Sequence, residues 1–371
     1  MQDPHNILLI KAHSLGIGDV LRASASWRVL KNRWPQARLH LLFLSKHAGY
    51  VTESLMKEHS LLDSATFITV REGDPSQPSA RRVPLAELAK RVRDLCRQLQ
   101  PDLIIDTESA GIRTSLLTWL GARVCGATTV GVAQFPLRSL FYDLAAPSTR
   151  DYIRQRGLPE PMDYTHRDFV PLAALGLQRD NTPIELAVTS AGRTYQVSLR
   201  ERLHSGEWSG TNRPLLGLNI GCGTPDAIPR RPDVAALVEA MGLLAQRWPH
   251  TLLLCGAPFE REINQAFVAA YARRWGGVDH MLDLAGSCSL SELTGLIDSC
   301  DLFVTSDSGP YHMSVALRRP TLVWFNYEER AAVHHHPWCR GLIRPSPETF
   351  VSTVLSLHAL AAPCQAVSAP G

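Results

Sequence analysis

The sequence predicts an α/β protein of two domains, and three observations lead to that prediction. Short apolar runs alternate with segments of helical periodicity, which is the pattern of strand–helix–strand units that form parallel sheets. This alternation fills both halves of the chain without repeating any sequence. A polar seam with several Gly and Pro residues, 187–214, separates the halves. The length of 371 residues agrees, because roughly 150 residues per domain is typical.

Each element of the two domains is predicted from such a run. The strands expected in the first half are Ile7–Lys11, Arg38–Leu44, Ala65–Val70, Leu103–Asp106 and Thr129–Ala133, with helices at Val20–Arg33 and Pro84–Leu99. The strands expected in the second half are Leu215–Ile220, Thr251–Cys255, Met281–Leu284, Leu302–Thr305 and Thr321–Phe325, with helices at Pro232–Arg247, Glu260–Trp275, Leu290–Ser299 and Gly309–Leu317. A further helix, Ala191–Leu203, is expected inside the seam, and the tail after Leu360 is expected to be frayed. We therefore predict two Rossmann-like domains, 1–187 and 188–371, whose parallel sheets face each other across a cleft.

Composition excludes several classes of protein. A hydrophobic fraction of 45% excludes a disordered chain, and no apolar run approaches the roughly 18 residues of a membrane span. The run Ile7–Ile10 is closed by Lys11 and has no cleavage site after it, so we expect a cytoplasmic protein without a signal peptide. The 8 cysteines contain no Cys-x-x-Cys pair and are expected to be small core residues.

Charge is distributed unevenly between the halves. Residues 1–190 carry 23 Lys and Arg against 19 Asp and Glu, whereas residues 191–371 carry 15 against 16. A basic first half suits an anionic partner or the inner face of the cytoplasmic membrane. The alternative is a solvated basic face without a function. No nucleic-acid partner is expected.

In open α/β sheets, ligands bind beyond the carboxyl ends of the strands. After the first strand, Gly16 and Gly18 allow a tight turn and Asp19 opens a helix. Asp19 is either a general base at the mouth of the cleft or a helix N-cap. The glycines do not complete G-x-G-x-x-G, which disfavours a nicotinamide dehydrogenase.

A second candidate loop follows a strand in the second half. Asp307, Ser308 and Gly309 lead into Pro310, so a helix with free backbone amides is expected to start here and to bind phosphate. His312 is placed to donate a hydrogen bond to a diphosphate. The alternative is an ordinary strand–helix turn.

Two more loops point to the same ligand. Thr224 lies in a Gly-rich turn that leads to Arg230 and Arg231, and guanidinium groups suit anionic oxygens. Glu260 follows the next strand and is either a ribose ligand or a carboxylate favoured by a helix N-terminus. No Asp-x-Asp pair occurs, and the adjacent residues of the run His334–His336 cannot easily converge on one ion, so we expect no metal and no resident cofactor.

Four segments in this order resemble glycosyltransferase family 9, the ADP-heptose:lipopolysaccharide heptosyltransferases, over roughly residues 6–345. They are Ile7–Lys11 with Gly18-Asp19-Val20; Leu137-Arg138-Ser139-Leu140-Phe141-Tyr142; Gly256-Ala257-Pro258-x-Glu260; and Leu284–Leu293 running into Asp307-Ser308-Gly309-Pro310-x-His312.

The resemblance implies a GT-B fold and metal-independent, inverting transfer of a sugar from a nucleotide diphosphate donor. The first domain then binds an anionic saccharide or glycolipid acceptor and the second binds the donor. By resemblance, Asp19 matches the catalytic base, Asp307 to Gly309 match the site for the donor sugar and diphosphate, and Glu260 matches the ribose ligand. Gly18, Arg81, Arg82 and Arg138 are the residues that we expect to contact the acceptor.

The sequence departs from the family pattern around the donor site. The family carries a lysine where this chain has Pro229, so Arg230 or Arg231 is expected to take its place. After the last strand the family continues Phe-Gly-Pro-Thr, whereas this chain reads Phe325-Asn326-Tyr327-Glu328. The expected function is transfer of heptose from ADP-heptose to an envelope saccharide. The alternatives are a sugar-nucleotide 2-epimerase of the same fold and an inactive glycan-binding protein.

Overall fold

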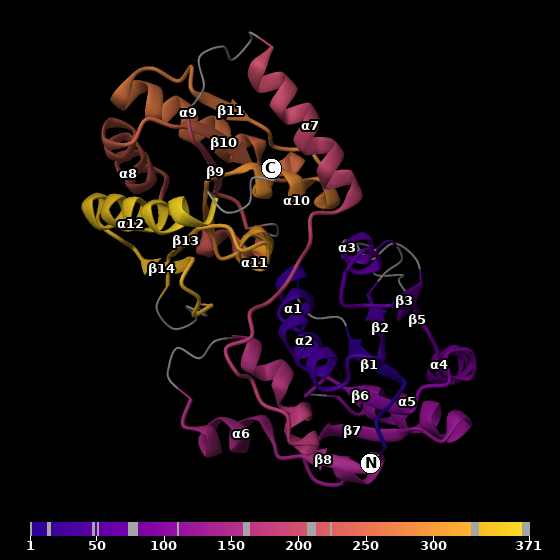
Figure 1. Ribbon diagram of the computed structural model, residues 1–371. Helices are drawn as coiled ribbons and strands as arrows, with labels where there is room; N and C mark the ends of the chain where they lie inside the picture. The colour runs from indigo at the N-terminus through magenta and orange to yellow at the C-terminus, as the bar shows by residue number, and fades with distance from the viewer. Residues whose placement is uncertain are drawn as a thin grey trace. The chain divides into compact units, whose positions relative to one another are not determined.

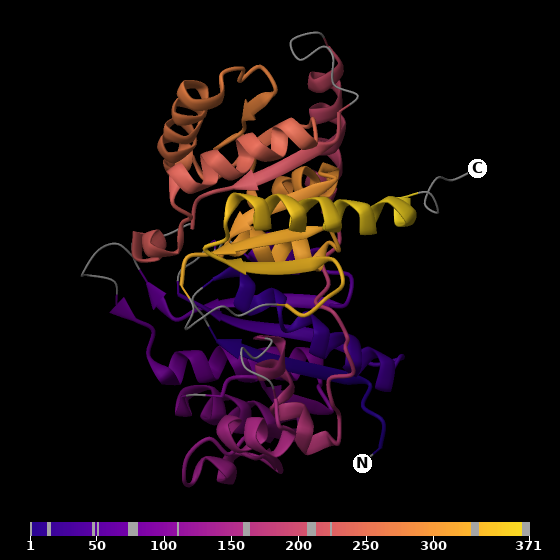
Figure 2. The same ribbon diagram turned by 90° about the vertical axis from the view of Figure 1, so that its left-hand side faces the viewer.

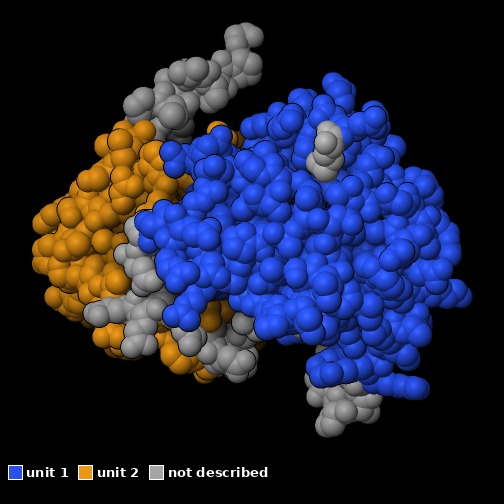
Figure 3. Space-filling view, turned by 90° about the horizontal axis from the view of Figure 1, so that it is seen from below, with its two compact units in different colours: residues 1–184 blue, residues 185–371 orange. Residues whose placement is uncertain are grey.

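The computed structural model describes residues 2–12, 16–46, 49, 52–72, 81–109, 111–158, 164–205, 213–222, 225–327 and 334–365. The chain divides into two compact units, residues 1–184 and 185–371, which Figure 3 colours separately. The sequence-based boundary lay between residues 187 and 188. None of the helices in the described part of the chain combines the length and hydrophobicity needed to cross a membrane.

Unit 1 is built on a six-stranded sheet in which every strand pairs in parallel, in the order β3-β2-β1-β6-β7-β8 (Figure 1). Its elements are β1 (Asn6–Ala12), α1 (Ile17–Leu21), α2 (Ser24–Arg33), β2 (Arg38–Ser45), α3 (Glu53–Lys57), β3 (Ser64–Thr69), β4 (Arg71–Glu72), β5 (Arg81–Arg82), α4 (Leu85–Leu99), β6 (Leu103–Asp106), α5 (Ile112–Cys125), β7 (Thr128–Val132), the 3-10 turn η1 (Arg138–Phe141), β8 (Leu144–Ala146), α6 (Thr149–Arg156), η2 (Tyr164–Phe169) and η3 (Pro171–Leu175).

Unit 2 repeats this architecture with a second parallel sheet of six strands, in the order β11-β10-β9-β12-β13-β14. Its elements are α7 (Ser190–His204), β9 (Leu215–Asn219), η4 (Pro225–Arg230), α8 (Val234–Arg247), β10 (Thr251–Cys255), η5 (Pro258–Glu260), α9 (Arg261–Trp275), β11 (Met281–Asp283), α10 (Leu290–Ser299), β12 (Leu302–Ser306), α11 (Gly309–Ala316), β13 (Thr321–Phe325), β14 (Cys339–Ile343) and α12 (Pro347–Gln365). The prediction of two Rossmann-like domains with parallel sheets is confirmed.

Both sheets are buried on two faces, as parallel sheets require. In unit 1, Leu8 and Ile10 of β1 pack with Val92 of α4 and Leu117 of α5 in one core. Leu9, which lies between Leu8 and Ile10, is also buried, so both faces of the middle of the strand are covered. In unit 2, α12 lies against α8 and against β13 and β14 (Figure 2). The helix continues through Gln365, so the tail is helical for several residues beyond Leu360, where we expected fraying.

The helix expected at Val20–Arg33 is divided in two. The hydroxyls of Ser24 and Ser26 donate to the carbonyl oxygens of Leu21 and Ala23, at 2.5 and 2.7 Å. Serine side chains that bond to nearby backbone compete with the helical hydrogen bonds. The chain therefore forms α1 and α2 with a turn at Arg22 and Ala23.

The helix expected inside the seam, α7, packs on α10 of unit 2. Gly192 of α7 and Gly295 of α10 let the two backbones touch, because a Cβ on Gly295 would lie 1.9 Å from the carbonyl oxygen of Gly192. Thr189 caps α7 and donates to the carbonyl of Ser291 at 2.8 Å. These contacts explain why the unit boundary precedes the helix.

Candidate functional site

The candidate sites lie where the strand order of each sheet reverses direction. In unit 1 the switch point is between β1 and β6, and in unit 2 it is between β9 and β12. Open α/β sheets bind ligands outside the carboxyl ends of the strands at such a point. Asp19 lies in the first turn of the helix that follows β1, and Asp307–Gly309 lead from β12 into α11, so both segments selected from the sequence follow switch-point strands.

In unit 2 the loops after β9 and β12 are joined by side-chain hydrogen bonds. The hydroxyl of Ser308 donates to Oδ1 of Asn219 at 2.9 Å, and Ser306 donates to the carbonyl of Gly221. The thiol of Cys222 lies 3.3 Å from the Ser306 hydroxyl, and burial raises the pKa of that thiol to about 11. The two loops are therefore fixed against each other.

The N-terminus of α11 is aimed at this switch point without a side-chain cap. Ser308 is the N-cap residue in extended conformation, but its hydroxyl bonds to Asn219 and no side chain caps the helix. Pro310 occupies the first turn, where its missing N–H costs nothing. The first-turn amides and the positive end of the helix dipole together suit an anion.

Arg230 and Tyr327 both reach Asp307. The Arg230 guanidinium lies 3.5 Å from Oδ2 of Asp307 and remains 42% exposed, while the Tyr327 hydroxyl donates to the same oxygen. Burial and this carboxylate raise the pKa of Tyr327. The Nε of Arg231 is buried and has no hydrogen-bond partner among the described residues. The segment that ends at Arg231 therefore carries two guanidinium groups, and the Nε–H of Arg231 is a hydrogen-bond donor without an acceptor among the described residues.

Glu260 lies at the end of η5, which follows β10. It is buried, and its Oε2 accepts from the backbone N–H of Ala257 at 2.8 Å. The carboxylate also lies against Gly221, where any side chain would collide with it. Glu260 therefore holds the loop after β10 close to the loop after β9, and its expected contact with a ribose stays a prediction.

His312 of α11 is paired with a histidine from the run 334–336. Its Nδ1 lies 2.9 Å from Nε2 of His334, whose backbone N–H donates to the Tyr311 hydroxyl at 2.7 Å. His334 and His336 are buried but His335 is exposed, so the run diverges. Within the ranges that the structure describes, no group of three His, Cys, Asp or Glu side chains is arranged to hold a metal ion.

In unit 1, Asp19 lies in the first turn of α1 and belongs to a network of charges. Helix α1 begins at Ile17 with Gly16 as its N-cap residue, so the interpretation of Asp19 as an N-cap is wrong. Arg22 donates to Asp19 through Nη1 and to Asp168 through Nε. Gly18, an expected acceptor contact, is buried within α1.

Arg138, the second expected acceptor contact, has no exposed surface. Its nitrogens donate to the Ser115 hydroxyl, to the carboxylate of Asp106 and to the carbonyl oxygens of Ser109, Glu108 and Val132. A buried guanidinium with these partners holds the loop after β7 to β6 and α5. The assignment of Arg138 as an acceptor ligand is therefore corrected to a role inside unit 1.

Arg81 and Arg82 form the exposed strand β5, which pairs antiparallel with β4. Arg82 lies opposite Arg71, and Arg81 lies opposite Glu72. Arg71 and Arg82 are a pair of like charges on opposite strands, so this short hairpin presents an excess of positive charge to solvent.

The structure thus brings Arg230 and Asp307 together, and Ser308 and Gly309 follow directly at the start of α11. Thr224 lies outside the described residues. Five further residues form hydrogen bonds or ion pairs around the candidate sites and were not selected from the sequence: Asn219, Tyr327, Lys11, Arg22 and Asp168. Lys11 and Tyr327 belong to segments that the family pattern includes, whereas no sequence motif around Asp168 indicates a role for it.

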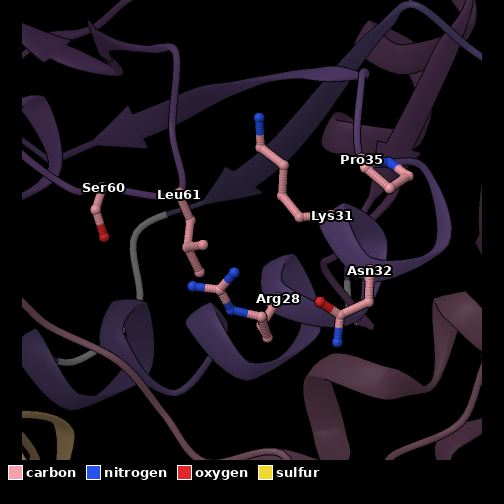
Figure 4. Close-up of a pocket in the computed structure, with 6 residues that line it drawn as sticks. All are labelled: Arg28, Lys31, Asn32, Pro35, Ser60 and Leu61. Atoms are coloured by element: carbon pink, nitrogen blue, oxygen red, sulfur yellow. The ribbon is translucent and has the colours of Figure 1, made fainter.

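A separate groove of about 570 Å³ lies in unit 1 (Figure 4). It is lined by Arg28, Lys31, Asn32, Pro35, Ser60 and Leu61. These residues precede β2 and β3, so the groove lies at the amino edge of the sheet, away from Asp19. Lys31 donates to Asp63 at 3.0 Å and to the carbonyl of Ala37 at 2.9 Å. The groove is not part of the candidate site.

Comparison with protein families identifies one match. Residues 175–340 match the model of glycosyltransferase family 9 (heptosyltransferase). A comparison with curated protein sequences finds no match.

Solved structures share the fold over nearly the whole chain. ADP-heptose lipopolysaccharide heptosyltransferase II of E. coli is 16% identical with a TM-score of 0.66, covering 96% of this chain and 99% of its own. A family 9 glycosyltransferase of Veillonella parvula is 16% identical with a TM-score of 0.67, covering 97% and 99%. The E. coli heptosyltransferase WaaC with ADP-2-deoxy-2-fluoro heptose is 15% identical with a TM-score of 0.61, covering 96% and 99%.

The two parallel sheets and these comparisons define the class of protein: the chain is a glycosyltransferase with the GT-B fold. Its resemblance to family 9 is confirmed by the family model across residues 175–340.

Proposed function

We propose that this protein transfers heptose from ADP-heptose, with inversion, to a saccharide of the lipopolysaccharide core or a related envelope glycolipid. One observation carries the proposal. The uncapped N-terminus of α11 is fixed at the switch point of unit 2, in the same unit as Arg230 and Arg231. Such an arrangement suits a diphosphate. The neighbouring structures from E. coli are named for ADP-heptose and lipopolysaccharide, which supports the choice of donor and acceptor.

In this proposal unit 2 binds the donor. The amides of Ser308 and Gly309 and the guanidinium of Arg231 meet the diphosphate, and they stabilise the charge that develops as the sugar leaves. Arg230 adds positive charge beside Asp307, and His312 donates a hydrogen bond while His334 holds its ring. Glu260 accepts from the ribose, and Thr224 completes the site.

Unit 1 binds the acceptor, and Asp19 removes the proton from its attacking hydroxyl. The side chain of Asp19 is 19% exposed, and its partner Arg22 is held at its other end by the buried Asp168. The exposed arginines of β5 attract the anionic acceptor or the inner face of the cytoplasmic membrane, where such a glycolipid would lie.

A panel of nucleotide sugars tests the donor. A ligand that binds only the folded protein raises the thermal midpoint by mass action. We expect ADP-heptose and ADP to raise the midpoint, and UDP- and GDP-sugars at equal concentration to leave it nearly unchanged. A larger shift with a uridine or guanosine nucleotide would contradict the proposed donor.

A further inference from the structure

The ion pairs that connect Asp19 with Arg22, Asp168 and Lys11 include a residue that the proposed function does not yet use. We propose that Asp168 is a positioning residue that holds Arg22 in place and partly neutralises the positive charge of Arg22, so that Asp19 remains an effective base. This inference rests on the proposed function, in which Asp19 accepts the proton of the acceptor hydroxyl.

Asp168 joins three elements through its two carboxylate oxygens. Oδ1 accepts from the ammonium of Lys11 at 2.9 Å, and Oδ2 accepts from Nε of Arg22 at 2.6 Å. Lys11 belongs to β1, Arg22 is the C-cap residue of α1, and Asp168 belongs to η2. The side chain of Asp168 is only 2% exposed, so these bonds lie within the unit, and the other end of Arg22 donates to Asp19.

The geometry makes Arg22 a bridge. Its guanidinium uses Nε for Asp168 and Nη1 for Asp19, and a planar fork with fixed donors can hold two carboxylates at once. Because Lys11 also holds Asp168, the Nε side of the Arg22 guanidinium is fixed in position, and its Nη1 side contacts Asp19. The side chain of Asp19, which accepts from Nη1 of Arg22, is 19% exposed.

Charge balance adds a second effect. Although burial alone would raise it, the pKa of Asp168 is lowered by the adjacent Lys11 and Arg22, so this carboxylate is ionised at neutral pH. Glu108 lies beside the same lysine, accepts from the N–H of Ala12 at 3.0 Å, and has its pKa raised by burial. The other ionisable side chains of η2 are Tyr164, His166 and Arg167.

The consequence for Asp19 has a definite sign. With Asp168 ionised, the positive charges of Arg22 and Lys11 are largely balanced before they act on Asp19. Without it, the positive charges of both cations act on Asp19 uncompensated, which stabilises its ionised form and weakens it as a base. Arg22 also loses the bond that fixes its orientation.

The first test is Asp168→Asn, which keeps the shape and removes the charge. With ADP-heptose and a heptose-free lipopolysaccharide core as probes, we expect kcat to fall roughly 10- to 100-fold, as misplacement of a reacting group does. The acid limb of the pH–rate profile should move to lower pH, because a neighbouring negative charge has been removed. An unchanged pH profile would overturn the proposal, since a purely structural role moves only the amount of folded protein.

A double-mutant cycle with Asp19→Asn separates positioning from structure. If Asp168 acts through Asp19, adding Asp168→Asn to Asp19→Asn should reduce the residual rate no further. Multiplying losses would contradict the proposal. If Asp168→Asn does not fold, Arg22→Lys is the second variant, because a point charge cannot bridge both carboxylates, and the same absence of a further loss is expected.

Asp63→Asn is the matched control. Asp63 also accepts from a lysine, Lys31, and from a backbone N–H, that of Leu39, but it lies at the amino edge of the sheet. We expect this variant to lower stability and leave the pH profile in place. A pH shift equal to that of Asp168→Asn would overturn the proposal, because the effect would then be unspecific.

A measurement without turnover keeps this inference distinct from the proposed function. The ¹³C resonance of the Asp19 carboxyl, assigned by its loss in Asp19→Asn, reports its titration directly. We expect its midpoint to be lower in Asp168→Asn than in the unaltered protein. If the midpoint moves but Asp19→Asn retains full activity, the base assignment fails while the coupling stands; if the midpoint does not move, the coupling fails.

Discussion

Residue type alone did not show which arginines of this chain are available to a ligand. Arg138 and Arg81 were both expected to meet the acceptor, yet Arg138 is fully buried and Arg81 is exposed. The partners of Arg138 come from β6, the loop after it, α5 and the end of β7, which are brought together only by the fold. Long-range partners of this kind leave no periodicity in the sequence, so their discovery required the structure.

The burial of Arg138 leads to a prediction about stability. Arg138→Met should lower the free energy of unfolding of unit 1 by about 3–5 kcal/mol, because it leaves Asp106 as a buried charge without its guanidinium partner. Urea unfolding followed by circular dichroism measures the loss, with Arg150→Met on the exposed side of α6 as the control. A stable variant with a raised KM for the acceptor would restore the original assignment.

His250 leads to a prediction about pH. Its Nδ1 donates to the carbonyl of Trp248 at 2.7 Å, and burial lowers its pKa to about 4. The unfolded chain binds this proton near pH 6.5, so His250 contributes no pH dependence above that value and costs stability as the pH falls toward 4.

The variant His250→Asn keeps a donor and removes the titration. The loss of stability of unit 2 between pH 6.5 and 4 should then shrink by roughly 1–3 kcal/mol, as measured by hydrogen exchange of the β10 amides. Identical slopes for the two proteins would show that His250 is not the group responsible.

At the scale of elements, the strands that are buried on both faces were predicted from their continuous apolar runs. The edge strands β8 and β14 were not, because each is only partly buried and β14 contains Arg340 and Gly341. Helix α5 was expected between two strands but was given no bounds, since its buried face includes Thr114, Ser115 and Gly121 and carries no apolar stripe.

The same reasoning explains how much of the site was predictable. Asp19, Glu260 and Asp307 each lie in the segment that leads from a strand into the next helix, so locating the strands located these residues. Asp168 is separated from Lys11 by 157 positions and from Arg22 by 146, and no local pattern links them.

The β4–β5 hairpin carries a prediction about the acceptor. Changing Arg81 and Arg82 together to Ala should raise the KM for an anionic acceptor, and more so at low salt, where exposed charges are least screened. The KM for the donor should stay unchanged. Steady-state kinetics at two ionic strengths measure both constants. A selective rise in the donor KM would show that the units were assigned the wrong way round.

The N-terminus of α11 supplies the reciprocal variant. Gly309→Val crowds the amides that are proposed to meet the diphosphate, so it should raise the donor KM and leave the acceptor KM unchanged. Equal effects on both constants would mean that the helix terminus acts through folding and not through the donor.

At the scale of the whole molecule, two units with the same strand order are proposed to divide the work of one transfer reaction. Each presents its functional loops at its own switch point, with a carboxylate in unit 1 and an uncapped helix N-terminus with two arginines in unit 2. The proposed division agrees with the uneven charge of the two halves, since the more basic half is assigned the anionic acceptor.

The donor site also leads to a prediction about metal. The negative charge of the diphosphate is proposed to be met by helix amides and guanidinium groups, so activity should persist in EDTA. Rates before and after chelation test this directly. Complete loss, restored by magnesium or manganese, would contradict the proposed electrostatics.

The central claim is that Asp19 activates an acceptor for sugar transfer from ADP-heptose. The most direct test measures ADP release and glycosylated product with and without a heptose-free lipopolysaccharide core, for the unaltered protein and for Asp19→Asn. Turnover should require the acceptor and should fall by roughly 10²- to 10⁴-fold in the variant, while the Kd for ADP-heptose stays the same. Conversion of the donor without any acceptor, as an epimerase would give, or a variant that keeps more than about a tenth of the rate, would contradict the claim.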